Sequence, residues 1–238
     1  MTTRGTLFLH GYGVRGQIWD TLRAALGSNV GRTAAPDVEA TDADDLQRAA
    51  REAAMQFSGR IDGSLVLVGH SLGSALAALV AQQVGPPTIA GAVLIAPPYG
   101  ERTDRPGPIM RFLLRHRLIP PALLRPRFFS HHTPIEIQRE VFANAVPEAP
   151  GVQELSLQRR FFHTDLINGP LPVPSLVIAS ERDRIVPVDQ SRRFGELLGS
   201  RLMILPAREG VGHDDFFASP EIAARTAGII AEFASGLR

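Results

Sequence analysis

The sequence predicts one α/β domain, in which a mostly parallel β-sheet is flanked by helices. Short apolar runs such as Leu65–Val68 and Ile89–Ala96 alternate with amphipathic segments, which is the pattern of parallel strands joined by crossover helices. The length of 238 residues and the hydrophobic share of 44% allow one substantial core and leave little room for a second full domain. Charged residues make up 21% of the chain, which argues against general disorder.

Strand and helix patterns follow one another from the start of the chain to its end. In the first part, strands are expected at Thr6–Leu9, Arg32–Ala35, Ser64–Val68 and Ile89–Ala96, and helices at Gln17–Leu26, Asp42–Phe57 and Ser74–Val84. Thr41 is the expected cap of the second helix, whose first turn carries acidic residues. In the last part, strands are expected at Ser175–Ala179 and Leu202–Leu205, followed by a helix over Pro220–Phe233.

Between Pro97 and Pro174 this alternation stops. The segment is rich in proline, arginine and phenylalanine, and it contains helical patches at Ile109–Leu118 and Glu136–Ala145 but no clear strand. A structureless loop of this length would be unusual in a compact domain, so a packed insertion is favoured. We therefore predict a core formed by residues 1–96 and 175–238 and a mostly helical cap, or lid, over residues 97–174.

The composition excludes several kinds of chemistry. Without cysteine, the chain has no disulfide, no thiolate nucleophile and no Cys-ligated metal. All 25 basic residues are arginine, so a Schiff-base lysine, a P-loop lysine and a Ser–Lys dyad are excluded as well. The formal net charge of +1 does not indicate nucleic acid or an anionic membrane as the main partner.

The start of the chain shows no pattern of a targeting or membrane segment. Its apolar run is three residues long, shorter than a signal-peptide core, and nothing elsewhere approaches the roughly 20 apolar residues that span a bilayer. We therefore expect a soluble, cytoplasmic protein. The use of arginine alone, with many alanines, glycines and prolines, is typical of a bacterial gene rich in guanine and cytosine.

The segment Gly69-His-Ser-Leu-Gly73 matches the G-x-S-x-G pattern, which places a nucleophilic serine in a sharp turn between a strand and a helix. Leu65–Val68 precedes it and the helix Ser74–Val84 follows, as this turn requires. The glycines leave room for a strained backbone, and the helix N-terminus adds partial positive charge where an oxyanion would form. Ser71 is therefore the candidate nucleophile. The alternative is a plain turn whose glycines serve only its geometry.

A serine nucleophile needs a general base and an acid that orients the base. His213 lies in a glycine-containing loop between the last strand and the last helix, which suits an imidazole aimed at the carboxyl edge of the sheet. Asp183 follows the strand Ser175–Ala179 and is the candidate acid. Glu181 and Asp189 are its rivals, because both lie in the same region of the chain.

These motifs and their order along the chain resemble the α/β-hydrolase superfamily, in its cap-bearing, serine esterase-like branch. The serine, the aspartate and the histidine follow one another in the order of that family, and the resemblance extends to His10-Gly11-Tyr12-Gly13 and Asp183–Pro187. It covers Thr6–Ala96 and Pro174–Arg238, whereas the cap matches only by position. Members often have two more strands before the His-Gly turn, so we expect a shortened sheet of about six strands.

The resemblance implies roles for further residues. The backbone N–H groups of Tyr12 and Leu72 would form the oxyanion hole, where each donor is worth about 2.7–4 kcal/mol of barrier. The His10 side chain would brace its turn without transferring a proton. Tyr12, His70 and Tyr99 are the expected substrate-binding residues.

We predict that no cofactor and no metal takes part. His131-His132 and His163-Thr-Asp165 contain possible metal ligands, but no other ligands cluster with them in the sequence, so packing or surface roles are predicted. Six phenylalanines of the cap segment cannot all face solvent without forming a sizeable apolar patch, and some are expected to line an acyl pocket. They are Phe112, Phe128, Phe129, Phe142, Phe161 and Phe162.

The expected reaction is hydrolysis of a carboxylic ester, or a related acyl compound, through a Ser-His-Asp triad and a covalent acyl-enzyme. The same triad also acts on thioesters, lactones, amides and some C–C bonds, and fold and triad do not separate these substrates. A type II thioesterase or a lactone hydrolase is the main alternative within enzymes. A non-catalytic small-molecule binding protein on this fold is the alternative of another class. The expected partner is a small acyl substrate, with no nucleic acid and no membrane. The sequence does not indicate whether the chain is a monomer or a homodimer.

Overall fold

Six strands form one sheet in a computed structural model, which describes residues 4–28, 30–102, 107–116 and 118–237. The strands are β1 (Gly5–Leu9), β2 (Arg32–Ala34), β3 (Leu65–His70), β4 (Ile89–Ile95), β5 (Ser175–Ser180) and β6 (Arg201–Leu205). Their order is β2-β1-β3-β4-β5-β6, and every adjacent pair is parallel. The predicted parallel sheet of about six strands is confirmed. The winding reverses between β1 and β3, and sites in such sheets lie outside the carboxyl ends of the strands near that reversal.

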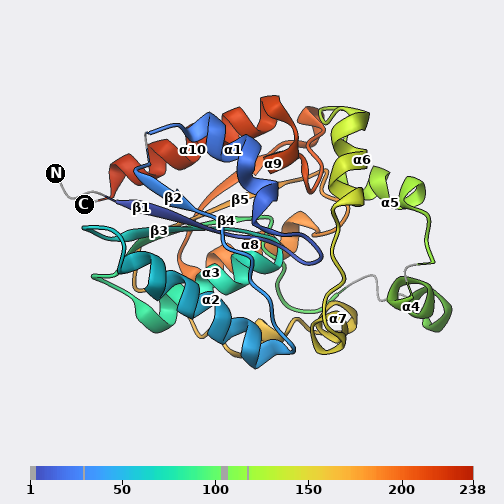
Figure 1. The fold of residues 1–238 in the computed structure, drawn as a ribbon, viewed down its shortest axis with the longest axis horizontal. Helices are drawn as coiled ribbons and strands as arrows, with labels where there is room; N and C mark the ends of the chain where they lie inside the picture. Colours follow the sequence, from blue (N-terminus) through green and yellow to red (C-terminus); the bar gives the residue numbers. More distant parts are fainter. Residues whose placement is uncertain (1–3, 29, 103–106, 117, 238) are drawn as a thin grey trace.

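Helices cover both faces of the sheet (Figure 1). On one face lie α2 (Ala43–Ser58), α3 (Leu72–Val84) and α8 (Val188–Leu198), and on the other lie α1 (Asp20–Leu26), α9 (Asp215–Ala218) and α10 (Pro220–Gly236). A short 3-10 helix, η1 (Gly16–Trp19), leads into α1, and another, η3 (Ala207–Glu209), follows β6. Among the described residues, no helix has both the length and the apolar character needed to cross a membrane.

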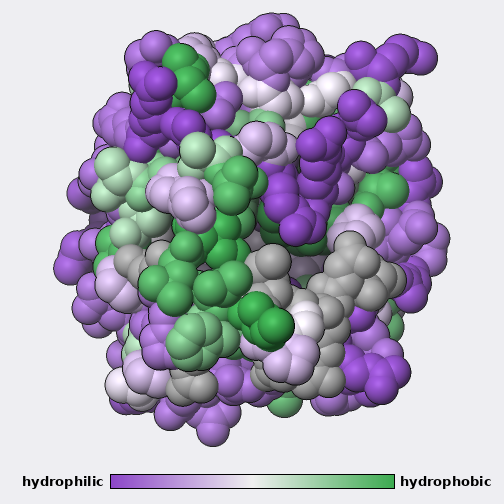
Figure 2. Space-filling model, turned by 90° about the vertical axis from the view of Figure 1, so that its right-hand side faces the viewer, coloured by the Kyte–Doolittle hydropathy of each residue, from purple (hydrophilic) through white to green (hydrophobic). Residues whose placement is uncertain are grey.

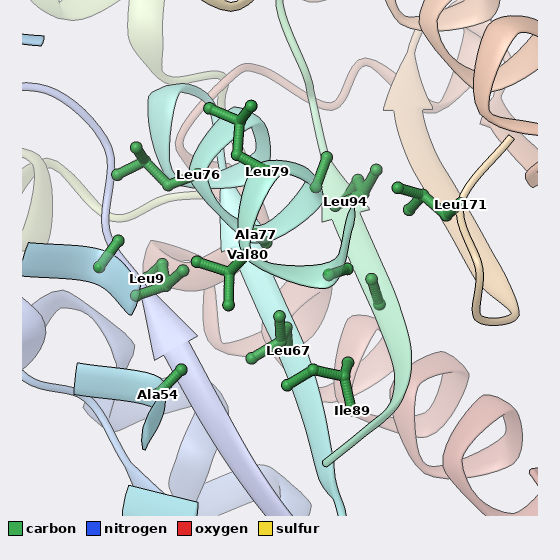
Figure 3. Packing of buried hydrophobic residues seen from close by; sticks show 14 of the residues in the cluster. Leu9, Ala54, Leu67, Leu76, Ala77, Leu79, Val80, Ile89, Leu94 and Leu171 are labelled. Atoms are coloured by element: carbon green, nitrogen blue, oxygen red, sulfur yellow. The ribbon is translucent and has the colours of Figure 1, made fainter. Parts of the chain in front are cut away.

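Alternation of side chains along the strands produces two cores, one on each face of the sheet. In β1, Leu7 and Leu9 contribute to the first core, whereas Phe8 belongs to the second. In the first core, side chains of α3 meet those of β1, β3 and β4 (Figure 3). Buried residues run without interruption from Gly73 to Ala81, because α3 lies between the sheet and α2. This explains why the sequence of α3 is apolar on nearly all sides.

Residues 97–174, which we call the inserted segment, form helices between β4 and β5 and, in their described part, no strand. The helices are α4 (Pro108–Arg115), α5 (Pro121–Phe128), α6 (Ile135–Ala143), α7 (Pro150–Leu157) and the 3-10 helix η2 (Phe162–Asp165). They gather at the end of the molecule toward which β1 and β3 run (Figure 1). An isolated antiparallel bridge between Glu101 and Arg160 joins the start of the segment to the stretch between α7 and η2.

The two helical patches predicted in this segment correspond to α4 and α6, although residue 117 of the first patch lies outside the described residues. Seen from this end of the molecule, hydrophobic residues gather in one area beside hydrophilic ones (Figure 2). The exposed large hydrophobic side chains of the segment include Ile109, Phe112, Leu118 and Leu123.

Two local predictions need correction. Asp42, not Thr41, caps α2, because the Asp42 side chain accepts the N–H groups of Asp44 and Asp45. Thr41 instead donates its N–H and its hydroxyl to Asp45 Oδ2, at 2.9 and 3.1 Å. The single helix predicted over Gln17–Leu26 is divided into the 3-10 helix η1 and the α-helix α1.

The helix α3 approaches β1 very closely at Gly73. A Cβ atom at this position would lie 2.0 Å from the carbonyl oxygen of Leu9 and 2.6 Å from that of His10. At Gly69, just before the turn, a Cβ atom would lie 2.2 Å from the carbonyl oxygen of Gly73. These neighbours are backbone atoms, which cannot move aside as the end of a flexible side chain can. Both positions therefore require glycine.

Gly73→Ala is expected to lower the free energy of unfolding by about 1–3 kcal/mol, because the added methyl group overlaps the backbone of β1. Gly228→Ala is the matched control, since a Cβ atom at this position of α10 meets nothing within 4 Å in the described part of the chain. The control should raise stability by roughly 0.5–1 kcal/mol. Urea unfolding of the parent and both variants measures these differences. Equal stability of Gly73→Ala and the parent would contradict the close packing.

Candidate active site

Ser71 lies in the turn between β3 and α3 with a left-handed backbone, φ 53° and ψ −120°. This conformation is uncommon for a residue other than glycine and needs support from its surroundings. The N–H of Ser71 donates to the carbonyl of Ile95 at 2.9 Å, and its carbonyl accepts the N–H of Ser74 at 3.0 Å. The hydroxyl of Ser74 lies 2.8 Å from the carbonyl oxygens of Gly69 and Ile95, to which it donates. The sharp turn expected from the G-x-S-x-G pattern is therefore present, with Ser71 at its tip.

The turn after β1 lies directly against Ser71. A Cβ atom on Gly11 would be 3.3 Å from the Cβ of Ser71. The His10 ring holds this turn, since its Nε2 accepts the N–H of Val38 at 2.8 Å and its Nδ1 donates to the carbonyl of Gly11 at 2.9 Å. Burial lowers the pKa of His10, in keeping with a neutral ring that makes both bonds. His10 therefore braces the turn, as predicted.

The inserted segment fixes the far end of the same turn. The N–H of Gly13 donates to Glu148 Oε1 at 2.8 Å, and the carbonyl of Gly13 accepts the N–H of Val146 at 2.9 Å. Arg15 also donates to Glu148 Oε1, at 3.2 Å, and both side chains of this ion pair are largely buried. The backbone of Tyr12, the residue before Gly13, is thereby held in place beside the serine turn.

His213 and Asp183 form a buried pair beside the carboxyl ends of the strands. Nδ1 of His213 and Oδ2 of Asp183 are 2.7 Å apart, and the two side chains are 3% and 1% exposed. Because a carboxylate oxygen only accepts, Nδ1 carries the proton and Nε2 is left with its lone pair. The second oxygen of Asp183 accepts the N–H groups of Ile185 and Val186 at 2.8 and 2.9 Å. The acid and the ring are therefore both fixed in orientation.

The two rival acids of this region make no hydrogen bond to His213 among the described residues. Glu181 accepts the N–H of Ala207 at 2.9 Å and forms an ion pair with Arg192. Asp189 lies in the first turn of α8, exposed to solvent. Of the three candidates, Asp183 is the one that is hydrogen-bonded to His213.

His70, the residue before Ser71, links the serine turn to the His213 loop. Its ring centroid lies 4.5 Å from that of His213, and its Nε2 donates to the carbonyl oxygen of His213 at 2.9 Å. Burial, together with the nearby His213, lowers the pKa of His70 well below its usual range, so the ring is neutral. The ring is buried against Trp19 and Phe217. This position favours a supporting role over the direct substrate contact expected from the sequence.

Asp214 is a buried carboxyl beside this pair of histidines. Its Oδ1 lies 3.9 Å from Nε2 of His70. Burial raises the pKa of Asp214 to about 7, while the nearby His213 opposes the rise and Asp183 and Asp215 add to it. The pKa of His213 is also raised. Burial alone lowers this pKa, but the charge and hydrogen bond of Asp183, together with the charge of Asp214, outweigh the effect of burial.

The ligand atoms of His70, His213 and Asp214 lie within 4.8 Å of one another, which is close enough for a metal ion. However, Nε2 of His70 and Nδ1 of His213 are engaged in hydrogen bonds of 2.9 and 2.7 Å. A metal held by these atoms would displace both bonds inside a buried cluster. We therefore interpret the three side chains as a buried cluster, in which His70 holds the backbone of the His213 loop and Asp183 holds the His213 ring.

Asp215 joins the inserted segment to the loop that carries His213. The Asp215 side chain is fully buried. Its carboxylate accepts the hydroxyl of Ser130 at 2.5 Å, the hydroxyl of Thr133 at 2.6 Å and the N–H of Gly212 at 2.7 Å. Ser130 and Thr133 belong to the inserted segment, whereas Gly212 directly precedes His213. One carboxylate therefore fixes the position of the segment relative to the histidine.

Phenylalanines of the inserted segment approach His213. The ring centroid of Phe128 lies 6.2 Å from that of His213 and 5.7 Å from that of Phe142. Phe129 is buried and lies 6.1 Å from Phe142. Of the six phenylalanines predicted to pack, Phe112 is 56% exposed, and the other five are partly or fully buried. The prediction that they cannot all face solvent is confirmed.

Two other residues singled out in the sequence have packing partners. Tyr99 stacks on Phe194 of α8, with ring centroids 5.0 Å apart and an angle of 21° between the rings. Nε2 of the buried His163 donates to the carbonyl of Pro98 at 2.7 Å. For Tyr99, this position favours packing over the substrate contact expected from the sequence.

A family model described as "Alpha/beta hydrolase family" matches residues 6–226. The chain belongs to this family. The predicted superfamily is thereby confirmed, and with it the prediction of a hydrolase enzyme. Among curated proteins, no sequence match is found.

Solved structures of esterases and of a lipase share the fold. An esterase from Exiguobacterium antarcticum gives a TM-score of 0.77 at 16% identity, over 99% of this chain and 94% of the esterase. The esterase RhEst1 from Rhodococcus sp. gives 0.75 at 20% identity, over 99% and 92%. A monoacylglycerol lipase from Paleococcus ferrophilus gives 0.73 at 19% identity, over 98% and 96%. At such low identities, the likeness establishes the fold and not the substrate.

Three acidic side chains of this alpha/beta hydrolase site were not indicated by the sequence analysis. Asp214 and Asp215 stand between His213 and the apolar pair Phe216-Phe217, and acids in such an apolar context indicate buried carboxyls with a function. This signal could have revealed both of them. Glu148 has no comparable signal, because its partners are far away in the sequence.

Asp214→Asn is expected to make stability less dependent on pH. The folded parent keeps this carboxyl protonated up to about pH 7, whereas the unfolded chain ionises it near the usual value of 3.8. Raising the pH through this interval therefore lowers the free energy of unfolding, by up to about 1.4 kcal/mol per pH unit from one group. Asparagine cannot ionise, so the stability of the variant relative to the parent should increase from pH 4 to pH 7 in urea unfolding. A constant difference would contradict this assignment.

Proposed function

We propose that this chain hydrolyses a carboxylic ester, or a closely related acyl compound, through a covalent acyl-enzyme on Ser71. One observation carries the proposal: His213 is bound to the buried carboxylate of Asp183 at 2.7 Å, in a loop that contacts the serine turn through His70. A serine with an oriented imidazole base nearby is the arrangement that acyl transfer requires.

In the proposed reaction, Oγ of Ser71 attacks the acyl carbon while Nε2 of His213 accepts the hydroxyl proton. Asp183 stabilises the imidazolium that forms. The N–H groups of Tyr12 and Leu72 stabilise the oxyanion, and each is worth about 2.7–4 kcal/mol of barrier. His213 then protonates the leaving alcohol and, as base again, activates the water that deacylates the serine.

Two features of the fold support this oxyanion hole. Leu72 is the first residue of α3, and the first N–H groups of a helix have no acceptor within it. The helix also contributes partial positive charge at this end. Tyr12 lies in the turn that packs against Ser71 and is held at Gly13 by Glu148.

We propose that the inserted segment acts as a cap over the substrate. Phe128, which lies beside His213, and Phe142, which packs on Phe128, would provide apolar surface for an acyl chain. This arrangement supports a small or medium apolar acyl group as the preferred substrate.

A panel of p-nitrophenyl esters, acyl-CoA thioesters and lactones tests the substrate class. We expect esters with short to medium acyl chains to have the highest kcat/KM. Ser71→Ala should lower kcat by about 10⁶-fold, because the attacking hydroxyl is removed. A fluorophosphonate probe should label the parent and not the variant, and circular dichroism should show that both are folded.

Each departure from this pattern has a distinct meaning. Faster turnover of thioesters or lactones would replace the ester in the proposal. Absence of both turnover and labelling in the parent would favour a binding protein without catalysis. More than a few per cent of activity in Ser71→Ala, with contaminating esterases excluded, would mean that another group attacks the substrate.

Asp183→Asn is expected to lower kcat by about 10⁴-fold, because an amide no longer holds the His213 ring in the required tautomer. Glu181→Gln and Asp189→Asn are matched controls that remove nearby carboxylates without a bond to His213. Both controls should reduce kcat far less. A greater loss at either control than at Asp183 would reassign the orienting acid.

A further inference from the structure

A cavity of about 570 Å³ lies between the inserted segment and the core, away from Ser71. On the side of the segment it is lined by the end of α5, by the residues that follow it and by α6; on the side of the core it is lined by the loops after β5 and β6. Neither Ser71 nor His213 lines it. The lining residues of the two sides include Arg127, Phe129, His131, Arg182, Arg184 and Arg208.

The lining is strongly cationic. Four arginine side chains meet at this cavity, and no aspartate or glutamate lines it. Within the part of the chain that the structure describes, none of the four forms an ion pair. The acids adjacent to them in sequence have other partners: Glu181 pairs with Arg192, Asp183 with His213, and Glu209 with Arg225. The positive charge of the cavity is therefore not neutralised from within the described protein.

The walls of the cavity are held in place by hydrogen bonds. Ser130 is bound by the buried carboxylate of Asp215, and Gln138 donates to the carbonyl of Thr133 at 2.8 Å. Across the seam between segment and core, Arg184 donates to the carbonyl of Pro126 at 3.3 Å. These bonds hold the backbone around the cavity, while the four arginine side chains are themselves exposed to solvent and to an incoming anion.

His131 and His132 contribute to the same wall. Their ring centroids lie 4.2 Å apart with the rings tilted by 33°, and Nε2 of His132 donates to the carbonyl of Glu209 at 2.6 Å. His131 itself lines the cavity. His131 therefore belongs to this wall, and its neighbour His132 binds the loop after β6 beside it.

We propose that this cavity binds a small anion with two or more phosphate-type charges. Guanidinium groups match the geometry of phosphate oxygens and bind them through paired hydrogen bonds. Like charges gathered at one cavity repel one another, and a multivalent anion would relieve that repulsion. The volume lies within the range of roughly 300–1,000 Å³ that small-molecule sites occupy.

The position of the cavity links its occupancy to the candidate active site. Arg182 and Arg184 flank Asp183 in sequence, and Gly210, also a lining residue, precedes His213 by three positions. A ligand that contacts both sides of the cavity would hold the inserted segment against the core. Binding should therefore raise the thermal unfolding temperature of the protein.

Isothermal titration calorimetry of the full chain with inorganic pyrophosphate, and separately with ATP, tests the proposal. The pocket variant is Arg127→Gln/Arg208→Gln. The matched control is Arg51→Gln/Arg193→Gln, which removes the same charge from exposed positions outside the cavity. We expect saturable one-to-one binding by the parent and the control, and a loss of at least about tenfold in affinity in the pocket variant.

A folding control and a second pocket variant separate loss of the binding site from loss of the fold. Circular dichroism establishes that each variant is folded, and Arg182→Gln/Arg208→Gln replaces the pocket variant if it is not. Three results would overturn the proposal. They are no binding of either pyrophosphate or ATP, an equal loss of affinity in the pocket variant and the control, and binding of heparin without binding of either small anion. Equal affinity for the two probes would mean that phosphates alone are recognised, and tighter binding of ATP that the organic part also makes contacts; both results support the site. No turnover is measured, so the outcome is independent of the proposed esterase activity.

Discussion

The left-handed backbone at Ser71 is the constraint on which the rest of the site depends. It is possible because β3 and α3 meet where Gly69 and Gly73 leave no side chain between backbone segments. The same close contact brings the end of β1 beside the serine. The turn that follows β1 therefore has to pack directly against Ser71. A continuous buried face of α3, from Gly73 to Ala81, anchors the helix against the sheet. Packing of the core thus maintains a conformation that the local sequence would not favour by itself.

The three acids around His213 differ in how the cost of burying a carboxyl group is compensated. Asp183 is a buried carboxylate whose charge is satisfied by the His213 ring and by two backbone N–H groups. Asp215 is satisfied by hydroxyl and backbone donors. Asp214 has a pKa raised to about 7, so burial keeps it protonated below neutral pH. A buried charge without partners would be costly, which explains why Asp214 stays protonated. The negative charge that orients His213 therefore lies mainly on Asp183.

The sheet and the serine turn could be predicted because their signals are local in the sequence. The apolar strands and the G-x-S-x-G pattern each lie within a few residues. By contrast, α5 contains Pro126, and a proline inside a helical pattern argues against a helix. The choice of Asp183 over Glu181 depends on the loop after β5, where the backbone of Ile185 and Val186 turns to donate to one carboxylate. No pattern along the chain carries that geometry.

Contacts between distant residues were also beyond sequence reasoning. Gly13 is bound by Glu148, which is 135 positions away, and Thr133 is bound by Asp215, which is 82 positions away. Each of these contacts depends on how the inserted segment packs on the core, which the sequence does not reveal. The exclusions based on composition are of another kind: they need no geometry, because a residue type that is missing cannot act.

The carboxylate of Asp215 has a consequence for how members of this family can exchange parts. Its donors Ser130 and Thr133 come from the inserted segment, so a chimera that replaced all of residues 97–174 would leave a buried charge without them. Such a loss costs about 1–3 kcal/mol or more and would also disturb the loop of His213. The segment is therefore not one transferable module. Residues around 130–133 must be inherited together with Asp215, whereas α4, which precedes them, can diverge without touching that bond.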